Sequence, residues 1–464
     1  MKCKLIALSL SLTCGGSAIF AHEIDFAYPA FSFDLFSRVQ ARIQAEDPSA
    51  NVVLSPLSVW NALGMLKQGA SDSTLDGICQ TLGLSGEASA VMLNYDHDML
   101  DLLTTPLDWY HYYDPKTLPV LEIANSCWVD DEISLLESYC DSIIFGYNAE
   151  CFTDDLQQQS AMERVDEWVN LHTHGMIPSL NLEPETALHL LLVNTLFFQA
   201  GWSIPFRKDN TELQSFYPMN GEEEYVPMMS LSTLLDYYES DKFQVVRLYL
   251  FDLEKYSMTF YLPKAQDEIL CLTKEDEELS INTFRSSGSS KAYVNLKLPR
   301  FEIGMERILN EELSQMGMSE AFSPSANFQA MSSEDPLSVS LIKQLARLEV
   351  AEYGVKASAA TIVGSQNEGD PEPGPEPEWI DITFNRPFYF TLEDSQLHET
   401  FFIGQVNSLE DEPGQDVSIT IPSLQGEEIE DKAYYDLMGM PHNAAQPGLN
   451  VLRKGGKSRL IMCR

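Results

Sequence analysis

Hydrophobic positions follow helical spacing in some segments of the chain and strand spacing in others. Apolar residues recur at helical spacing over Ser58–Lys67, after a proline that suits the first turn of a helix. Three short runs rich in β-branched and aromatic residues predict strands: Val193–Gln199, Val245–Phe251 and Ser257–Leu262. Tyr293–Leu298 alternates as a strand does, whereas Met305–Met316 predicts a helix. Helices and strands that interleave without a regular period favour an α+β fold.

An acidic, proline-rich stretch interrupts this pattern late in the chain. Gln366–Asp381 holds six acidic residues and four prolines but no basic residue. Such a composition does not form a core, because charged side chains stay in water and prolines donate no ladder hydrogen bonds. The stretch therefore predicts an exposed, extended loop.

The end of the chain has the pattern of a separate module. Acidic residues followed by Pro413 and Gly414 predict a linker, which divides a main domain, residues 22–409, from a tail, residues 410–464. Within the tail, Leu449–Met462 has two apolar runs around a pair of glycines. This pattern predicts a small β-hairpin.

Residues 1–21 have the order of a secretory signal peptide. Lys2 and Lys4 precede a short apolar run, and small residues follow it up to Ala21. The apolar run is too short to span a bilayer, and no later segment approaches the roughly eighteen consecutive apolar residues that a membrane helix needs. We therefore expect a secreted protein, extracellular or periplasmic, without membrane insertion.

Composition and charge narrow the classes of partner. The chain has 464 residues, 44% of them hydrophobic, which suffices for a large core. Its formal net charge of -41 repels phosphate backbones and anionic lipid surfaces, so we expect no nucleic-acid partner. A basic protein surface fits this charge better, and the alternative is that the charge serves solubility only.

The chain offers little catalytic or metal-binding chemistry. It lacks the nucleophile-elbow, zinc-protease, phosphate-loop and dinucleotide-binding motifs, so we expect no enzyme activity and no cofactor. His172 and His174 are a lone histidine pair, for which exposed positions are favoured over a metal site. Six irregularly spaced cysteines follow the signal peptide, which leaves free thiols and a Cys140–Cys151 disulfide both open.

Several segments, taken in order, resemble the serpin family of protease inhibitors along residues 30–408. Asn51–Ser58 is similar to the N-terminal signature of the family, Trp168 to the end of a helix across the main sheet, and Asn194–Phe198 to a strand beside the site of loop insertion. Further similar segments are Val226–Met229, Leu298–Phe301, Ala321–Pro324 and Asn385–Phe388. The resemblance implies the serpin fold: mixed and antiparallel sheets, about nine helices and an exposed reactive loop near residues 352–382.

The same resemblance places five residues where the main sheet opens: Ser55, Ser58, Asn194, Trp202 and Gln344. These residue types also suit buried hydrogen bonding or packing in any fold, so they indicate fold rather than activity. Gln344 stands where most serpins carry a histidine. It is still able to bridge two strands by hydrogen bonds, but it cannot titrate.

The hinge, Glu349–Ile362, decides activity, and it is similar to the family pattern Glu-x-x-Glu-x-Gly followed by small residues. The resemblance implies a suicide-type inhibitor of serine or cysteine proteases. Its cleaved loop inserts into the main sheet as a new strand and carries the covalently bound protease with it. The hinge residues are Glu352, Gly354, Val355, Ala357, Ala359, Ala360 and Thr361.

Insertion makes a demand on alternate side chains of the hinge. Because alternate residues of a strand share a face, one set must enter beneath the sheet: Val355, Ala357, Ala359, Thr361 and Val363. All five are small or β-branched and uncharged, whereas a buried charge would stall insertion. An inhibitor is therefore favoured over the alternative, a non-inhibitory serpin that serves in binding, storage or as a chaperone. Val355 replaces the usual Thr or Ser, a modest departure.

Two counts locate the bond that a protease would cut. Counting forward from Glu352 at the family distance gives Glu368–Gly369, and counting back from Phe384 gives Glu376–Pro377, because this loop is longer than usual. Proline after the cut generally blocks cleavage, so the candidates are Glu368, Gly369 and Asp370. An acidic bait fits a target protease with a basic pocket, bound covalently by a monomeric inhibitor. A cut at Ile362 or Val363 suits an elastase-like enzyme but shortens the inserted strand.

Short patterns in the tail resemble C-terminal modules on exported proteins of Bacteroidetes-type bacteria, some of which direct secretion. They are Tyr434–Gly439 and Gly448–Val451. This resemblance implies a bacterial protein whose tail serves sorting or cell-surface display. A plain β-hairpin appendage fits the same residues.

Overall fold

The structure is a computed structural model, and the chain divides into two units, residues 1–411 and 412–464, which are described separately. The residues that the structure describes are 17–105, 118–182, 184, 188–219, 221–251, 255–265, 271–285, 290–332, 337–355, 378–397, 399–409, 433–435, 441–442, 448–454 and 457–463.

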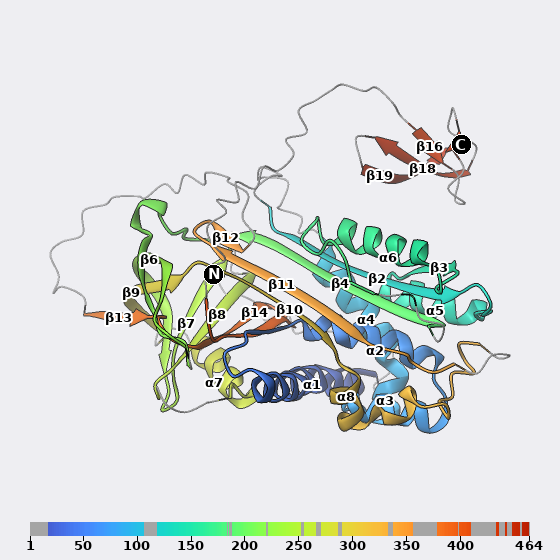
Figure 1. Ribbon diagram of the computed structural model, residues 1–464, viewed down its shortest axis with the longest axis horizontal. Helices are drawn as coiled ribbons and strands as arrows, with labels where there is room; N and C mark the ends of the chain where they lie inside the picture. Colours follow the sequence, from blue (N-terminus) through green and yellow to red (C-terminus); the bar gives the residue numbers. More distant parts are fainter. Residues whose placement is uncertain are drawn as a thin grey trace. The chain divides into compact units, whose positions relative to one another are not determined.

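Two β-sheets form the framework of the first unit (Figure 1). The described strands of the nine-stranded sheet run in the order β1–β15–β14–β8–β7–β6–β9–β13, with β5 paired to β6. Their bounds are Val52–Leu54 (β1), Glu212–Phe216 (β5), Glu224–Glu239 (β6), Phe243–Leu250 (β7), Tyr256–Pro263 (β8), Lys291–Pro299 (β9), Trp379–Thr383 (β13), Phe388–Asp394 (β14) and Glu399–Val406 (β15). The six-stranded sheet has the order β10–β11–β12–β4–β2–β3. Its strands are Val120–Asp130 (β2), Glu150–Asp154 (β3), Leu190–Gly201 (β4), Phe301–Ile308 (β10), Lys343–Ala351 (β11) and Gly354–Val355 (β12).

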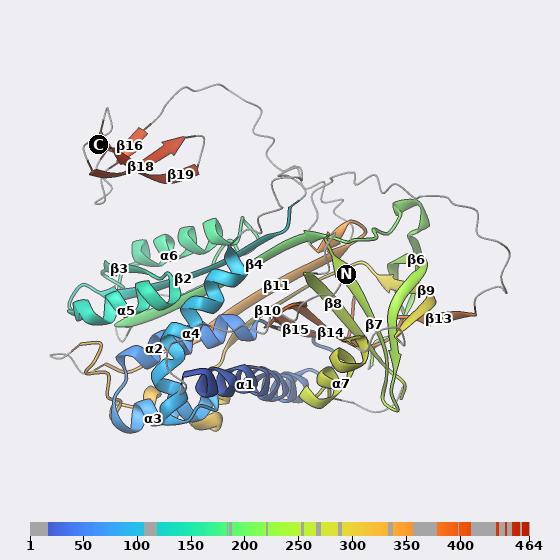
Figure 2. The ribbon, with the colours of Figure 1, turned by 180° about the vertical axis from the view of Figure 1, so that it is seen from behind.

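Helices cover both faces of the six-stranded sheet (Figure 2). The α-helices are Ser17–Glu46 (α1), Pro56–Gly69 (α2), Asp72–Leu82 (α3), Gly86–Thr104 (α4), Glu137–Tyr147 (α5), Gln159–His172 (α6), Lys274–Arg285 (α7) and Asn310–Leu313 (α8). Short helical turns lie at Lys208–Asn210 (η2), Ser314–Met318 (η3) and Ser319–Phe322 (η4). Helix α2 is buried along almost its whole length in the main core, whereas α6 packs on Leu191 and Val193 of β4 in a separate apolar cluster. No helix in the described part of the chain is long and apolar enough to cross a bilayer.

The predicted α+β fold is confirmed, with one helix prediction wrong in part. Strands β4, β7, β8 and β9 and helix α2 occur where the apolar pattern predicts them. The predicted helix over Met305–Met316 instead begins as strand, because β10 continues to Ile308 before α8 starts. Phe301, Ile303 and Met305 are buried in alternation with exposed neighbours, and pairing with β11 stabilises that strand.

The predicted acidic loop is shorter than its composition indicates. Trp379 begins β13, which pairs in parallel with β9, and Ile382 of this strand is buried. Ile380 and Ile382, two positions apart, lie on one face of a strand. The sequence pattern did not predict this strand because most residues before it are acidic or proline. Residues 356–377 lie outside the described residues.

Five cysteines of the first unit are free thiols: Cys79, Cys127, Cys140, Cys151 and Cys271. The alternative of a Cys140–Cys151 disulfide is therefore not realised in this structure. Burial raises the pKa of the Cys127 and Cys151 thiols, which keeps them in the unreactive protonated form.

The second unit contains the predicted hairpin. Strands Gly448–Lys454 (β18) and Lys457–Cys463 (β19) pair antiparallel, with Lys454 opposite Lys457 across the two glycines. Strands Ala433–Tyr435 (β16) and Pro441–His442 (β17) extend the sheet in the order β17–β16–β18–β19. These four strands form one small sheet within the second unit.

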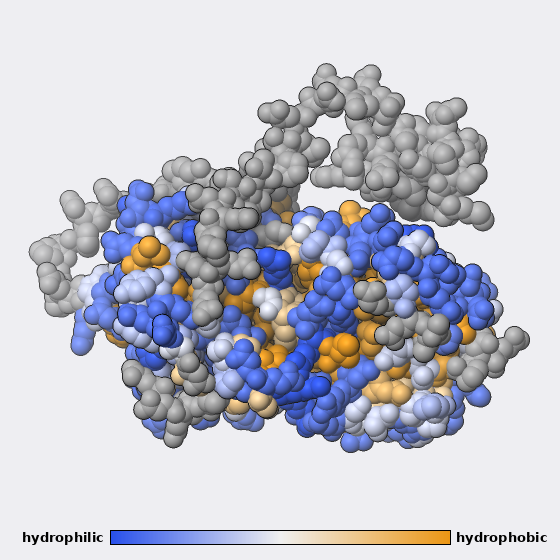
Figure 3. Space-filling view, viewed as in Figure 1, coloured by the Kyte–Doolittle hydropathy of each residue, from blue (hydrophilic) through white to orange (hydrophobic). Residues whose placement is uncertain are grey.

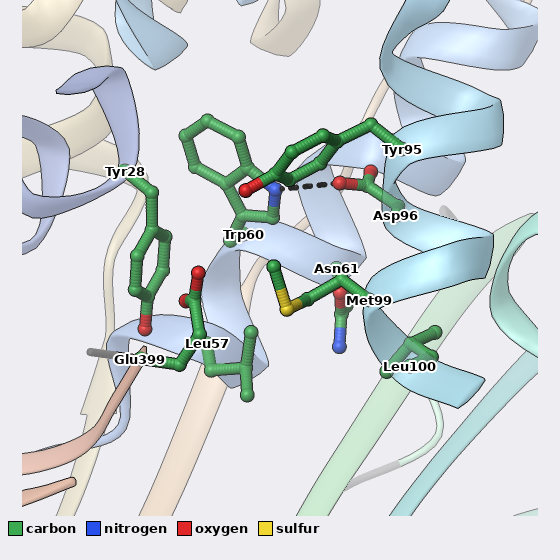
Figure 4. A pocket seen from close by; sticks show the side chains of 9 residues that line it. All are labelled: Tyr28, Leu57, Trp60, Asn61, Tyr95, Asp96, Met99, Leu100 and Glu399. Atoms are coloured by element: carbon green, nitrogen blue, oxygen red, sulfur yellow. Dashed lines mark hydrogen bonds between the residues drawn. The ribbon is translucent and has the colours of Figure 1, made fainter. Parts of the chain in front are cut away.

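Buried acids line a small cavity between α1, α2, α4 and β15 (Figure 4). Its volume is about 10 Å³, room for a single water molecule. The lining residues are Tyr28, Leu57, Trp60, Asn61, Tyr95, Asp96, Met99, Leu100 and Glu399. Asp96 accepts hydrogen bonds from Trp60 Nε1 at 3.1 Å and from the Tyr147 hydroxyl at 2.7 Å. Glu399 is only 6% exposed, and none of the described side chains donates a hydrogen bond to its carboxylate.

Glu399 holds a proton at neutral pH. Burial raises the pKa of this carboxyl to about 8, and the negative charges of Asp25, Asp394 and Asp96 act in the same direction. Burial also raises the pKa of Asp96 to about 7, against its two hydrogen bonds and the charge of Lys67. The folded chain therefore keeps protons in its core that the unfolded chain would release.

This difference predicts a stability that declines in alkali. Because the folded pKa of Glu399 lies above its ordinary value of 4.5, the free energy of unfolding falls as pH rises from that value through about 8. Glu399→Gln keeps the neutral form at every pH. We expect this variant to unfold near the temperature of the unmodified chain around pH 4.5 and several degrees above it around pH 9, measured by circular dichroism. The exposed Glu275→Gln is the control, and an equal shift of Glu399→Gln at both pH values would contradict the account.

Candidate functional site

Among the described residues, β4 and β11 of the six-stranded sheet leave most of their facing edges unpaired. On one side β4 pairs with β2 from Leu190 to Gln199, but on the other only its last two residues pair, with β12. Strand β11 pairs with β10 from Lys343 to Val350, and its other edge meets β12 only at Val350 and Ala351. Among the described residues no strand pairs with the remainder of either facing edge (Figure 1). Unpaired ladder groups favour the addition of a strand.

The two-residue strand β12 occupies one end of this opening. Val355 lies opposite Val350 on one side and Ala200 on the other, antiparallel to both neighbours. Its side chain is fully buried and belongs to the main core cluster. Strand β12 is thus aligned with the opening between β4 and β11.

The turn before β12 is fixed to the end of β4. The carbonyl of Glu352 accepts a hydrogen bond from Phe206 N at 2.9 Å, and its carboxylate accepts one from Thr211 Oγ1 at 3.0 Å. Arg300 lies 3.8 Å from the same carboxylate. Glu352 is 3% exposed, and these contacts anchor the turn beside the end of β4.

Trp202 makes a second attachment to this turn. Its indole Nε1 donates to the carbonyl of Ala351 at 2.8 Å, and its backbone N–H donates to the carbonyl of Tyr353 at 2.9 Å. The Lys208 ammonium lies over the Tyr353 ring, 5.4 Å from its centroid. Trp202 therefore joins the end of β4 to the residues on either side of Glu352.

Gly354 allows the close approach of β12 to β4. Its φ is 152°, a backbone conformation that side-chain-bearing residues rarely adopt. A Cβ at this position would overlap the carbonyl oxygen of Ala200 and lie 2.6 Å from Gly201 Cα. Only glycine fits between these strands without displacing one of them.

At the other end of the opening, both facing strands are tied to the start of α2. Ser58 Oγ donates a hydrogen bond to Asn194 Oδ1 of β4, and Asn194 Nδ2 donates to Asn125 Oδ1 of β2. From β11, Gln344 Nε2 donates to the carbonyl of Ser55 at 2.6 Å. Gln344 thus binds the residue before α2, whereas the sequence suggested a bridge between two strands. Its buried Oε1 and Ser55 Oγ have no hydrogen-bond partner among the described residues.

A charged cluster holds the end of α6 on the six-stranded sheet. Glu122 of β2 lies 2.6 Å from His172 Nδ1 and 2.8 Å from His174 Nε2. Glu150 of β3 accepts from Trp168 Nε1 at 3.0 Å and lies 3.4 Å from His172 Nε2. The expected exposure holds for His174 and is wrong for His172, whose side chain is largely buried.

The acids of this cluster control the charge of His172. Burial would lower the pKa of its imidazole, but the hydrogen bonds and charges of Glu122 and Glu150 raise it to about 9. The two histidines in turn lower the pKa of Glu122 to about 2, against its own burial. The cluster is therefore ionic at neutral pH. Sequence reasoning missed it because Glu122 and His172 are fifty residues apart and share no motif.

The structure divides the predicted site residues into two groups at opposite ends of the opening. Glu352, Gly354, Val355 and Trp202 meet where β12 enters the sheet. Ser55, Ser58, Asn194 and Gln344 meet at the start of α2. The remaining predicted residues lie outside the described part of the chain: Ala357, Ala359, Ala360, Thr361, Glu368, Gly369 and Asp370.

The fold places a two-residue strand between β4 and β11, whose facing edges are otherwise unpaired among the described residues. A family model described as Serpin (serine protease inhibitor) matches residues 27–409. The chain belongs to the serpin family. This agrees with the resemblance found in its motifs.

Two relatives and one solved structure illustrate the similarity. The chain is similar to human alpha-1-antichymotrypsin, with 28% identity over 393 residues that cover 83% of this chain and 89% of the relative. It is 29% identical to corticosteroid-binding globulin of Oryctolagus cuniculus over 384 residues, 81% of this chain and 93% of the relative. The crystal structure of a thermophilic serpin, tengpin, in the native state is similar with a TM-score of 0.69 and 25% identity, covering 83% and 94% of the two chains.

Gly354 provides a direct test of how β12 is held. Gly354→Ala forces the new Cβ against Ala200, so we expect β12 to separate from β4 and stability to fall by about 1–3 kcal/mol, measured by denaturant unfolding. Gly86→Ala is the matched control, because a Cβ there meets no atom within 4 Å. Equal stabilities of the two variants would show that β12 does not depend on this contact.

Proposed function

We propose that this serpin is a suicide-type inhibitor of serine or cysteine proteases. The observation that supports the proposal is the pair of unpaired facing edges on β4 and β11, with β12 already between them at one end. Among the described residues, these edges offer ladder hydrogen bonds that a strand from the loop would complete. The native fold is then a state that gains hydrogen bonds and buried apolar area when the loop inserts.

The register of β12 defines how the inserted strand would pair. If it continues beyond Val355, residues 356–365 lie opposite β4 from Gln199 back to Leu190. Ala357 would then lie beside Phe198, and Ala359 beside Leu196, on the face of β4 that packs in the main core. Small side chains at these loop positions fit between large ones already in place.

One proposed pairing would also give a hydrogen-bond partner to a buried polar atom of the sheet. In the same register Thr361 lies opposite Gln344 of β11 and Asn194 of β4. A threonine hydroxyl at that point would reach the buried Gln344 Oε1, which lacks a hydrogen-bond partner among the described residues. An unpaired buried oxygen costs about 1–3 kcal/mol, so satisfying it would favour the inserted state.

Inhibition would begin as ordinary proteolysis. The catalytic hydroxyl or thiol of the protease adds to the carbonyl carbon of the scissile bond, the C–N bond breaks, and the new amine leaves with a proton. The N-terminal part of the loop remains joined to the protease as an ester or thioester. Insertion of about ten residues then carries the protease roughly 30 Å along the sheet before water hydrolyses that bond.

The scissile bond is proposed at Glu368–Gly369, with Asp370 as a second candidate. Pairing along β4 ends opposite residue 365, so a cut at Glu368 leaves a segment just long enough to fill the opening. The partner would be a protease with a basic specificity pocket, held in a covalent complex by a monomeric inhibitor. The signal peptide and tail support secretion, with sorting or surface display as the proposed role of residues 410–464.

A non-inhibitory role is the second candidate, and similarity to corticosteroid-binding globulin favours it. A serpin that binds, stores or protects another molecule would not need its loop to insert. In that case a protease would cut the loop and be released.

A matched pair of loop variants distinguishes the two roles. Incubation with glutamyl, trypsin-like, chymotrypsin-like and elastase-like proteases should give, on a denaturing gel, a covalent complex and a released C-terminal fragment whose sequence identifies the cut. Ala359→Glu places a charge on the face that enters the core, so we expect cleavage without a complex. Ser358→Glu places it on the opposite face, and the complex should persist. Cleavage without a complex by every protease, even for the unmodified chain, would support the non-inhibitory role.

A further inference from the structure

Three exposed apolar side chains form a row across the nine-stranded sheet. Trp379 of β13 lies opposite Tyr293 of β9, and Tyr293 lies opposite Leu234 of β6. Their exposed fractions are 43%, 42% and 43%, and the Trp379 and Tyr293 rings are 5.2 Å apart. Because paired residues share a face of a sheet, the three side chains stand side by side in solvent. This set is called the apolar row below.

The positions next to the apolar row on the same face are polar. Asn295 Nδ2 donates to Asp381 Oδ1 at 2.8 Å, and Ser232 Oγ donates to Asn295 Oδ1 at 2.7 Å, across the same three strands. The side chains beside the apolar row on this face are therefore polar and at least partly solvent-exposed, in contrast to the apolar side chains of the row itself. Single exposed apolar residues are common, but three at paired positions on neighbouring strands indicate a surface that binds another molecule. On the face drawn in Figure 3, hydrophobic side chains are interspersed among hydrophilic ones.

The apolar row lies where the reactive loop returns to the protein. Trp379 is the first residue of β13, and residues 369–378 separate it from the proposed cut at Glu368. A chain of that length spans at most about 40 Å, close to the diameter of a protein domain. A protease that holds the loop at Glu368 is thus within reach of the apolar row.

Charge defines the kind of surface that would pack here. Glu378 and Asp381 beside Trp379 are exposed, and residues 366–381 hold six acids without a base. The nearby Lys291 lies 3.5 Å from Asp236, which offsets its charge. A partner must therefore combine an apolar patch with basic side chains around it.

We propose that Trp379, Tyr293 and Leu234 are a docking surface for the target protease, which presents an apolar patch bordered by basic residues. This inference rests on the proposed inhibitory function. The docking surface acts before the covalent step, because it lengthens the life of the non-covalent encounter and so raises the fraction of encounters that proceed to acylation. It makes no contribution to insertion, which takes place in the other sheet.

The test uses the panel protease that forms the covalent complex with the unmodified chain. The triple variant Leu234→Ser, Tyr293→Ser, Trp379→Ser should react at least about tenfold more slowly, and bind the protease with its catalytic nucleophile replaced by alanine at least about tenfold more weakly. The number of inhibitor molecules consumed per protease should not change. Leu171→Ser is the matched control, because Leu171 is 70% exposed on α6. This variant should change neither the rate of reaction nor the affinity for the inactivated protease.

The outcomes separate this inference from the proposed function. A triple variant that reacts as fast as the unmodified chain would overturn the docking surface and leave the inhibitory function intact. An unmodified chain that traps no protease of the panel would overturn both. If the triple variant unfolds at a lower temperature than the unmodified chain, Leu234→Ser and Tyr293→Ser alone, which leave β13 intact, decide between the same two results.

Discussion

The rest of this structure depends on the missing pairing between β4 and β11. On their far sides, β4 pairs with β2 over Leu190–Gln199 and β11 pairs with β10 over Lys343–Val350. In the described part of the chain, the sides that face each other meet only β12. The surrounding contacts maintain that opening. Glu352 and Trp202 fix the loop at one end, the start of α2 holds both strands at the other, and ion pairs between α6 and β2 keep the helix over the sheet.

Side-chain burial, rather than backbone pairing, decides whether a loop fills such an opening. A net hydrogen bond contributes about 0.5–1.5 kcal/mol, whereas ordering one residue costs about 1–2 kcal/mol, so ladder bonds roughly offset the entropy that the loop loses. The apolar area that enters the core must supply the remainder. This is why an uncharged, small or β-branched set at alternate loop positions matters more than any single residue. Val355, already fully buried, is the first member of that set.

Local patterns predicted much of the fold, and distant contacts account for what they missed. Val193–Gln199 and Ser58–Lys67 are recognisable because burial repeats within a few residues of chain. Met305 was misassigned because a short amphipathic strand beside a helix shares its apolar spacing, and β11 determines the outcome. At the site, the alternation of the hinge was visible in the sequence. The anchoring of Glu352 by Thr211 and Arg300 was not, because these partners are brought together only by the folded chain.

The heat stability of the chain before and after loop cleavage tests the central claim most directly. A protease that cuts the loop without being trapped leaves a nicked protein whose loop is free to insert. If β4 and β11 then accept the missing strand, the nicked chain should unfold at a markedly higher temperature than the intact chain, because a full set of ladder bonds and newly buried apolar area has been added. An unchanged or lower unfolding temperature after a cut near Glu368 would contradict the claim that this sheet is built to receive its own loop.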